Sequence, residues 1–326
     1  MGKKKILVIT PTAHLDEVNN ILNSILEAQI IYLPECNIHE FKKHCNSVAI
    51  FTNPNKSNIF LGKENLSDFK NLKIICTAST GTIHIDKDYC SLKEIKVISL
   101  KEERKVINKI PSTAEHAFAL MLSTLRNIPS SITSVKKGIW DYEPFIGRQI
   151  KSLTIGVIGY GRLGTFFSNY CDAFGAKVLV YDPYKDVNHP RIIQCKSLVE
   201  LSKNSDVISL HVHVTSETAK MINYNFLKNC KKSVLIVNTS RGEVINENDL
   251  LEFIKKNENA RYATDVLSSE INGINNNIIK KYSEENEKQI AITPHIGGMT
   301  KEAQNSAFSH AAYLLKDSFP LVNNLN

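Results

Sequence analysis

The amino-acid sequence predicts an α/β protein with two doubly wound parallel sheets. Strand-like and helix-like segments alternate along nearly the whole chain, which is typical of βαβ units and therefore of parallel strands. The length of 326 residues suggests about two domains, since a domain averages roughly 150 residues. Apolar residues make up 42% of the chain and charged residues 22%, so the composition is that of a folded globular protein.

The first sheet is expected between residues 4 and 100. Its strands are short runs rich in β-branched residues, and residues 15–28, between the first two runs, have the spacing of an amphipathic helix. The runs are KKILVIT (4–10), QIIYL (29–33), SVAIFT (47–52), LKIICTAST (72–80) and KVISL (96–100).

The second sheet is expected from residue 153 onward. Further β-rich runs recur there with helical segments between them, so the same parallel arrangement is predicted. The runs are LTIGVIGYG (153–161), KVLVYDP (177–183), DVISLHV (206–212), SVLIVNTS (233–240), ARYATDV (260–266) and QIAITPH (289–295).

Two longer helices flank the second set of strands. Residues 112–128 form the first, and we predict Ser112 as its N-cap with Glu115 as the capping-box partner three residues later. The second helix covers residues 300–319 and begins with Thr300. Each helix is placed to carry the chain from one domain to the other.

The predicted domain organisation is therefore discontinuous. Residues 1–108 and 296–326 form one domain, because the C-terminal helix returns to the first sheet. Residues 109–295 form the second domain around the second sheet.

Composition and charge exclude several classes of protein. The net charge is +7, from 40 basic and 33 acidic residues, but the longest basic run, Lys3 to Lys5, has no aromatic residue interleaved, so we expect no nucleic-acid partner. The seven cysteines show neither Cys-x-x-Cys nor zinc-finger spacing, which predicts free thiols and no metal site. No apolar run approaches the roughly 20 residues of a membrane helix, and the N-terminal segment is a poor signal peptide. A cytoplasmic protein without a membrane partner is expected.

A glycine-rich turn follows the first strand of the second set. Residues 153–167 place Gly159, Gly161 and Gly164 between a β-type run and a helical segment, the context that a dinucleotide-binding turn requires. Gly159 would make the tight turn, Gly161 would let the backbone approach a pyrophosphate, and Gly164 would allow close packing of helix on strand. The N–H groups at the start of the helix would then bind the phosphates.

An acidic residue ends the next strand. Asp182 lies 18 residues after Gly164, where a carboxylate can accept hydrogen bonds from both ribose hydroxyls of NAD and repel the extra phosphate of NADP. Arg162 lies in the turn and not beside Asp182. The sequence therefore predicts NAD as the cofactor. The alternative is a structural glycine turn with a surface aspartate.

At this point the chain resembles the NAD-dependent D-isomer-specific 2-hydroxyacid dehydrogenases over nearly its whole length. The resemblance rests on GYGRLG (159–164), NTSRG (238–242), the run from Asp265 to Glu270, PHIGG (294–298) and ASTGTIHID (78–86). The segment PHIGGMTKEAQ is especially similar to the phosphoglycerate dehydrogenase branch of that family.

The resemblance implies two Rossmann-like domains with the active site in the cleft between them. The discontinuous domain would bind the substrate and the domain of residues 109–295 would bind NAD. The residues implied to line the cofactor are Thr80, Gly159, Gly161, Arg162, Leu163, Gly164, Asp182, Val212, Thr239, Ser240, Asp265 and Gly298. Those implied to bind the substrate are Ser79, Thr80, Gly81, Thr82 and Arg241.

The catalytic residues implied by the resemblance are Arg241, Glu270 and His295. Reduction of a 2-oxo acid needs a clamped carboxylate, a polarised carbonyl and a proton for the forming alkoxide. The guanidinium of Arg241 suits the first two tasks through paired N–H donors, and His295 suits the third as general acid, or as general base in oxidation. Glu270 would accept a hydrogen bond from the other ring nitrogen, orient the ring and favour its charged form.

Three positions depart from the family pattern. His213 stands where the family often has Pro, and Ile271 follows Glu270 where it usually has Pro. The phosphoglycerate branch typically places an Arg after the third strand, whereas this chain has FTNPNKS there and no Arg in its first 103 residues. Lys56 could substitute only as a point charge.

These departures favour a general D-2-hydroxyacid dehydrogenase, an oxidoreductase that acts on a small 2-oxo or 2-hydroxy acid. The alternatives are D-3-phosphoglycerate dehydrogenase of serine biosynthesis and a glyoxylate or hydroxypyruvate reductase. An NAD-sensing binding protein or corepressor is the alternative from another class, and the intact Arg241, Glu270 and His295 argue against it.

A homodimer is also predicted. The helix from Ser112 to Arg126 carries more apolar residues than one helix face can hold, so burial on two sides is expected. Family members that resemble this chain pair through such a helix. The alternative is a helix buried between the two domains.

Overall fold

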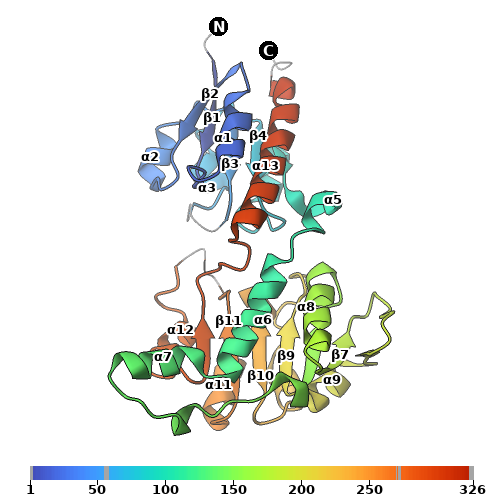
Figure 1. Ribbon diagram of the computed structural model, residues 1–326. Coiled ribbons are helices and arrows are strands. Elements are labelled where there is room, and N and C mark those ends of the chain that lie inside the picture. The colour runs from blue at the N-terminus through green and yellow to red at the C-terminus, as the bar shows by residue number, and fades with distance from the viewer. Residues whose placement is uncertain (1–2, 55–58, 269, 271–272, 323–326) are drawn as a thin grey trace. The chain divides into compact units, whose positions relative to one another are not determined.

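The structure is a computed structural model that describes residues 3–54, 59–268, 270 and 273–322. The chain divides into two compact units. Unit 1 combines the residues up to Ile110 with those from Met299 onward, and unit 2 runs from Pro111 to Gly298. In Figure 1, unit 1 carries the blue strands and the red C-terminal helix, and unit 2 carries the green to orange elements.

Unit 1 is built on a parallel sheet of order β2-β1-β3-β4-β5, which has five strands among the described residues. The order of the strands along the sheet changes direction at β1. β1 pairs with β2, where Ile6 lies opposite Ile30, and with β3, where Ile6 lies opposite Ala49. The strands are β1 (Lys4–Val8), β2 (Ala28–Tyr32), β3 (Ala49–Thr52), β4 (Ile74–Thr77) and β5 (Lys96–Ile98). The helices are α1 (Asp16–Asn23), α2 (Ile38–Lys42), α3 (Lys63–Leu66), α4 (Lys87–Leu92), α5 (Arg104–Ile107) and α13 (Lys301–Ser318).

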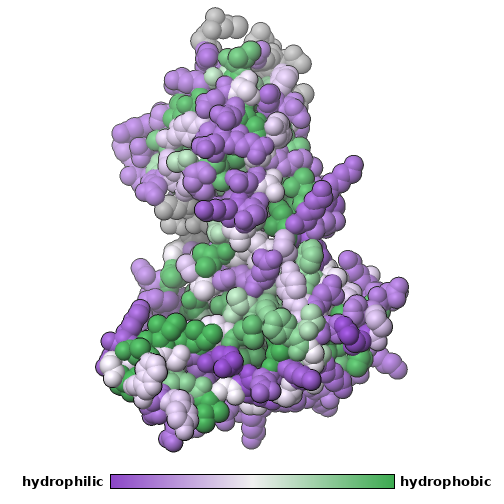
Figure 2. Space-filling view, viewed as in Figure 1, coloured by the Kyte–Doolittle hydropathy of each residue, from purple (hydrophilic) through white to green (hydrophobic). Residues whose placement is uncertain are grey.

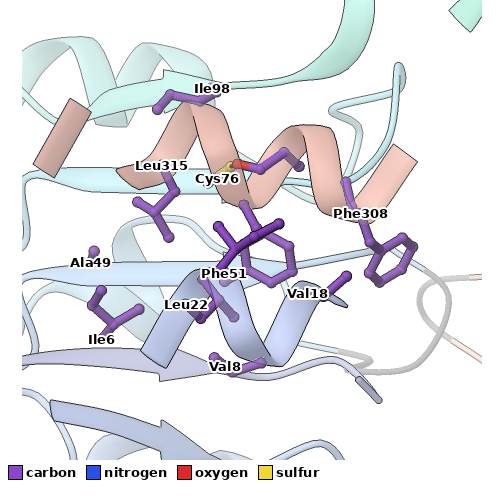
Figure 3. Close-up of a cluster of buried hydrophobic side chains, with 14 of the residues drawn as sticks. Ile6, Val8, Val18, Leu22, Ala49, Phe51, Cys76, Ile98, Phe308 and Leu315 are labelled. Atoms are coloured by element: carbon purple, nitrogen blue, oxygen red, sulfur yellow. Dashed lines mark hydrogen bonds between the residues drawn. The ribbon is translucent and has the colours of Figure 1, made fainter. Parts of the chain in front are cut away.

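Side chains alternate between the two faces of the unit 1 sheet, so this unit has a hydrophobic core on each face. Ile6 and Val8 face α1 and α13, whereas Leu7 and Ile9 face α2, α3 and α4, as expected for side chains that alternate across a sheet. Figure 3 shows the first core, with Leu22 of α1 and Leu315 of α13 over the strands. The C-terminal helix is therefore part of the first fold unit, and it starts as predicted, with the Thr300 hydroxyl accepting the N–H of Ala303.

Unit 2 is built on a second parallel sheet, of order β12-β11-β10-β9-β6-β7-β8, with seven strands in the part of the chain that the structure describes. The strands are β6 (Thr154–Ile158), β7 (Lys177–Tyr181), β8 (Ile192–Gln194), β9 (Val207–Leu210), β10 (Leu235–Asn238), β11 (Arg261–Thr264) and β12 (Ile290–Ile292). The helices are α6 (Ser112–Leu125), α7 (Ile128–Lys136), α8 (Arg162–Ala173), α9 (Leu198–Asn204), α10 (Tyr224–Leu227), α11 (Glu247–Lys256) and α12 (Ile278–Ser283). Two Rossmann-like sheets are therefore present, which confirms the predicted fold class.

Both faces of the second sheet are covered by helices. α6 and α8 pack on one face, and α9 to α12 pack on the other. The strands β6, β9, β10 and β11 are almost completely buried, which explains why they read as continuous apolar runs.

The start of α6 differs from the prediction. The helix begins at Ser112 itself, and Pro111 occupies the N-cap position without a side-chain cap from the described residues. The prediction of a capping box between Ser112 and Glu115 is therefore wrong. The Ser112 hydroxyl is buried, with no hydrogen-bond partner among the described residues, because the helix starts one residue earlier than the box requires.

β8 has no counterpart among the predicted strands. It is a three-residue edge strand, Ile192–Gln194, and only its first residue is buried. A run this short in a polar segment carries no usable periodicity.

Among the described residues, no helix is long and apolar enough to cross a membrane.

Asp206 joins the start of β6 to two cations and offers a test of the fold. Its carboxylate accepts the N–H of Thr154 at 2.9 Å and bonds Lys231 at 3.1 Å and Arg148 at 3.3 Å. Burial would raise the pKa of Asp206, but these hydrogen bonds and charges outweigh it, and the pKa lies below its ordinary value. Because the folded pKa is depressed, the stabilisation is complete at neutral pH and is lost as the pH falls through the folded pKa.

Asp206→Asn is expected to lower the free energy of unfolding at pH 7 by about 1.5–3 kcal/mol, the value of hydrogen bonds to a charged group. The difference from the unmodified chain should shrink as the pH falls below about 3.9, the ordinary pKa of Asp. Urea denaturation at a series of pH values measures both. Asp68→Asn, at an exposed position, is the matched control, and an equal loss there would show that the Asp206 contacts are not responsible.

Candidate active site

The candidate residues of unit 2 follow the carboxyl ends of neighbouring parallel strands. The strand register aligns the last residues of six strands in one row, so the residues that follow them gather at one edge of the sheet. The order of strands reverses between β6 and β9, and ligands of open α/β sheets bind at such a point. The following residues, in sheet order, are Asp182, Gly159, His211, Thr239, Asp265 and Thr293.

The glycine turn has the backbone that its sequence predicts. Gly159 follows β6 with φ +89°, a conformation that side chains disfavour. A Cβ on Gly159 would lie 2.6 Å from the carbonyl oxygen of His211, and one on Gly164 would lie 1.9 Å from the carbonyl oxygen of Gly159. Both glycines are therefore required by the close approach of β9 and α8 to the turn.

Gly161 differs from the other two glycines because a Cβ there would meet no described atom within 4 Å. It occupies the N-cap position of α8, which has no side-chain cap among the described residues. Arg162 and Leu163 open the helix. Open space in front of a helix N-terminus fits a pyrophosphate, since the first-turn N–H groups and the helix dipole both favour an anion.

The carboxylate of Asp182 is held beside this turn. One oxygen accepts the N–H of Tyr160 at 2.7 Å, and the other accepts the N–H of Tyr184 at 2.9 Å. These bonds fix the carboxylate where β7 ends and leave each oxygen a further lone pair. The position suits the recognition of ribose hydroxyls, so the residues present fit NAD.

Val212 and His211 form the other side of the turn. A Cβ on Gly159 would lie 2.8 Å from Cγ1 of Val212. Burial lowers the pKa of His211 to about 3, so its ring is neutral, and Nε2 lies 2.9 Å from the Ser209 hydroxyl. His211 therefore supports the turn as a neutral side chain packed on Phe167, 5.0 Å away between ring centres.

The segment after β10 holds Thr239, Ser240 and Arg241. The Ser240 hydroxyl and N–H both bind Oδ1 of Asn238, and Nδ2 of Asn238 donates to the carbonyl of Arg241 at 2.9 Å. The guanidinium of Arg241 donates to the carbonyl of Ser240 at 2.6 Å, and Thr239 is nearly buried. Asn238 thus fixes the backbone from which the Arg241 side chain extends.

Glu270 and His295 lie in direct contact. Oε1 of Glu270 is 2.7 Å from Nδ1 of His295, and the two side chains are about one-fifth exposed. These residues are 25 positions apart in the sequence, on the segments that follow β11 and β12. An imidazole hydrogen-bonded to a carboxylate through one nitrogen is the arrangement of a general acid–base catalyst.

The backbone of His295 is in the left-handed region, with φ +54°. Its N–H donates to the carbonyl of Asp265 at 3.0 Å, and the next two N–H groups, of Ile296 and Gly297, donate to the carboxylate of Asp265 at 2.9 and 2.7 Å. A left-handed residue other than glycine costs of order 1 kcal/mol, so Asp265 stabilises the turn that presents His295. Gly298 follows this turn, and a Cβ there would meet no described atom within 4 Å.

Asp265 is buried, with 2% of its surface exposed. Burial would raise the pKa of its carboxyl, but hydrogen bonds from His116, Thr293, Ile296 and Gly297 outweigh burial and hold the pKa below its ordinary value. The group is therefore a carboxylate at neutral pH.

Sequence reasoning missed two residues of this cluster, His116 and Thr293. Nε2 of His116 lies 2.9 Å from the Thr293 hydroxyl and 3.2 Å from Oδ1 of Asp265. A single histidine inside an apolar helix gives no sequence signal of such a contact, because Asp265 lies 149 residues further along the chain. Thr293 lies in the run that ends at His295 but belongs to no motif by itself.

The loop after β4, in unit 1, carries Ser79, Thr80, Gly81 and Thr82. The Ser79 hydroxyl donates to the carbonyl of Gly81 at 2.7 Å and is 2.9 Å from the Thr77 hydroxyl. These bonds fold the loop tightly at the carboxyl end of the strand, and all four residues are partly exposed. Ile271 and Lys56, which the sequence analysis singled out, lie outside the described residues.

Comparison with known proteins agrees with this geometry. Residues 118–297 match the model of the D-isomer specific 2-hydroxyacid dehydrogenase NAD-binding domain. D-3-phosphoglycerate dehydrogenase of Archaeoglobus fulgidus is 37% identical over 238 residues, which are 72% of this chain and 43% of that protein. Hydroxypyruvate reductase of Thermotoga maritima is 36% identical over 237 residues, 72% of this chain and 74% of that protein.

The solved structures include close relatives of the whole fold. D-lactate dehydrogenase of Aquifex aeolicus, crystallised with NAD and lactic acid, has a TM-score of 0.75 and 30% identity, and the match covers 98% of this chain and 97% of that one. The chain matches less than half of the length of the phosphoglycerate dehydrogenases. The matched family domain includes the glycine turn, Asp182, Arg241, Glu270 and His295, so the chain belongs to the D-isomer specific 2-hydroxyacid dehydrogenase family and carries its NAD-binding domain.

Proposed function

We propose that the chain is an NAD-dependent D-2-hydroxyacid dehydrogenase, an oxidoreductase that reversibly interconverts a small 2-oxo acid and its 2-hydroxy acid. The observation that carries the proposal is the 2.7 Å contact between Glu270 and His295, at the edge of the sheet that carries the glycine turn. A protein that only sensed NAD would have no need for an imidazole–carboxylate pair at this position.

When bound, NAD supplies or accepts the hydride. His295 donates a proton from Nε2 to the alkoxide that forms in reduction, and takes it back in oxidation. Glu270 accepts a hydrogen bond from Nδ1, which fixes the tautomer and the orientation of the ring. Arg241 binds the substrate carboxylate and polarises its carbonyl through the fork of N–H donors.

We propose that the remaining cofactor contacts come from the residues that the resemblance implied. In unit 2 these are the glycine turn, Asp182, Val212, Thr239, Ser240, Asp265 and Gly298, and in unit 1 they include Thr80. The backbone N–H groups of residues 79–82 are proposed to bind a carboxylate oxygen of the substrate. A tightly folded loop of partly exposed residues supports this role.

The proposed substrate is a small 2-oxo acid without a phosphate. The first 103 residues contain no arginine, and the described residues at the end of β3 are the uncharged Thr52 and Asn53. Arg is over-represented where a phosphate is recognised through paired donors. Phosphoglycerate oxidation remains the main alternative because of the relatives' names.

The test is a panel of 2-oxo acids with NADH, with kcat/KM as the measure. Pyruvate, glyoxylate, hydroxypyruvate and 3-phosphohydroxypyruvate are the informative members. A larger kcat/KM for one of the first three is expected. A clear preference for the phosphorylated acid would identify phosphoglycerate dehydrogenase, and no turnover of any member would favour an NAD-sensing binding protein or corepressor.

The cofactor preference rests on Asp182. Asp182→Asn keeps the size and the acceptor for the N–H of Tyr160 but removes the charge that repels the extra phosphate of NADP. The preference for NADH over NADPH, as a ratio of kcat/KM, is expected to narrow by about tenfold or more, which is the scale of one nearby charge pair.

Asp186→Asn is the matched control for this prediction. It removes an exposed carboxylate from the same loop and should leave the ratio unchanged. An unmodified chain that uses both cofactors equally would refute the role of Asp182.

We propose that the protein is a homodimer, as its helix composition predicted, but through a different surface. The large apolar residues of α6 pack within unit 2 itself, so they do not require a second chain. The segment after α6 exposes a series of large apolar side chains (Figure 2), which a monomer rarely does. They are Ile128, Ile132, Val135, Ile139, Trp140, Tyr142 and Ile146.

Light scattering at micromolar concentration should give twice the chain mass of 36.6 kDa. The double substitution Ile132→Glu with Val135→Glu places charges on this surface and should give the single-chain mass. Val199→Glu, at an equally exposed apolar position on α9, should leave the dimer intact. A monomeric unmodified chain would end the proposal.

We also propose a cytoplasmic location, which fractionation of the native cell would test.

A further inference from the structure

His116 is a hydrogen-bonded histidine that the proposed chemistry does not use. It lies in the second turn of α6, and its side chain is 18% exposed. Nε2 contacts both the hydroxyl of Thr293 and Oδ1 of Asp265. Cδ2 of the same ring is 3.7 Å from the position of a Cβ on Gly297, so the ring also packs against the turn that presents His295.

The direction of these hydrogen bonds follows from the donors available. The Thr293 hydroxyl has one proton, and it lies 2.5 Å from Oδ1 of Asp265, a carboxylate oxygen that can only accept. Thr293 therefore donates to Asp265, and Nε2 of His116 is the donor toward this pair. His116 thus supplies a donor that the buried carboxylate needs.

Asp265 connects this donor to the catalytic turn. Oδ1 accepts from His116, Thr293 and the N–H of Ile296, and Oδ2 accepts from the N–H of Gly297. The carboxylate thereby lies between α6 on one side and the two residues after His295 on the other. The left-handed backbone of His295 depends on these bonds, since it is otherwise unfavourable.

From this geometry we infer that His116 is a positioning residue that, through Asp265, holds the turn in which His295 meets Glu270. The inference rests on the proposed function, because it concerns the proton transfer of that reaction. It also gives Asp265 a task within the protein in addition to the cofactor contact implied by the resemblance.

Removal of the donor has a defined consequence. The Asp265 carboxylate would lose one of its donors while it remains buried, and a buried charge with an incomplete set of partners is costly. The turn can then relieve the cost only by a shift of the groups that Asp265 still binds, which are the N–H groups next to His295. A displacement of about 1 Å at a catalytic group can lower a rate by about 10²-fold.

Two substitutions separate the hydrogen bond from simple packing. His116→Leu keeps the apolar bulk against Gly297 and removes the donor. His116→Gln supplies an amide N–H at nearly the same reach. The matched control is His310→Leu, which removes an imidazole of similar exposure, 28%, from its 2.7 Å bond with Glu103 in unit 1.

The kinetic measurements are kcat and KM for the best 2-oxo acid of the panel, the solvent deuterium isotope effect on kcat, and NADH binding by fluorescence. For His116→Leu we expect kcat to fall about tenfold or more, the isotope effect to rise, and the dissociation constant of NADH to change less than about twofold. His116→Gln should restore kcat to within about threefold of the unmodified chain, and His310→Leu should not lower it. Equal losses in the Leu and Gln variants, or a normal kcat in His116→Leu, would overturn the inference.

A spectroscopic measurement tests the turn without substrate or cofactor. The proton shared by Nδ1 of His295 and Glu270 should give a downfield proton NMR resonance, assigned by its loss in Glu270→Gln. We expect His116→Leu to shift or broaden this resonance and His116→Gln to preserve it. An unchanged resonance in His116→Leu overturns the inference, whereas absent turnover with all 2-oxo acids overturns only the proposed function.

Discussion

Replacement of His295 with Ala is expected to slow the reduction of a 2-oxo acid roughly 10²–10⁴-fold, the usual contribution of a positioned acid or base. His295 is held by its 2.7 Å contact with Glu270. Glu270 and Arg241 follow β11 and β10, which are neighbours in the sheet. Without His295, the proton for the alkoxide has to come from water. NADH binding should change little, because the glycine turn and Asp182 lie on other strands.

Substitution of Glu270 separates its role from that of His295. His295 has to carry a proton on Nε2 for reduction and to lack it for oxidation. Glu270→Gln replaces the carboxylate that holds the ring through Nδ1 with a neutral amide, which is a weaker acceptor. The kcat of reduction should therefore fall, but by less than in His295→Ala, because the imidazole remains.

The results that would contradict this mechanism are distinct. A near-normal rate in His295→Ala would remove His295 from the chemistry. An unchanged kcat in Glu270→Gln would show that the 2.7 Å contact does not serve the reaction. Asp317→Asn, on the C-terminal helix of unit 1, is a control that removes a carboxylate without an expected change in kcat.

The fold was predictable because apolar runs marked nearly every strand. β6 and β9 are buried on both faces, and such strands stand out in the sequence. β8 was not predictable, because it is three residues long and mostly exposed. The start of α6 was also mistaken, since Ser112 and Glu115 fit a capping pattern that the backbone at Pro111 does not adopt.

The candidate site was predictable in a different way. The glycine turn follows from local rules, because Gly159 and Gly164 meet backbone atoms that exclude a side chain. The pairing of Glu270 with His295 was predicted from the family resemblance, because neither residue lies in a local sequence pattern that indicates the contact. His116 was not predictable from either source, because its role depends on a contact with Asp265 that only the packing of α6 against β11 creates.

The segment after α6 carries the surface that we propose for the dimer contact, and composition alone did not single it out. The apolar residues of α6 looked too numerous for one face, yet the sheet and α8 bury them. The exposed residues follow on α7 and the next loop, where no periodicity distinguishes a surface for another chain from a core.

Arg241→Lys is expected to lower kcat/KM for the 2-oxo acid by roughly 10²–10³-fold, the cost of a lost preorganised donor to a developing charge. Lysine keeps the positive charge, but it lacks the planar fork that can bind a carboxylate and a carbonyl together. The fork is directed by a fixed backbone, because Asn238 binds the carbonyl of Arg241 at 2.9 Å. The next residue is also fixed, since a Cβ on Gly242 would lie 2.1 Å from the carbonyl carbon of Leu267.

Separate measurements of kcat and KM for Arg241→Lys show whether Arg241 only binds the substrate or also stabilises the transition state. A residue that binds only the ground-state carboxylate would raise KM and leave kcat unchanged, whereas one that also polarises the carbonyl must lower kcat. Both changes are therefore expected, with NADH binding retained. Arg148→Lys, which keeps the charge opposite Asp206, controls for the exchange of an arginine elsewhere in unit 2. If Arg241→Lys changed KM alone, Arg241 would be a binding residue, and the polarisation of the carbonyl would have to come from His295.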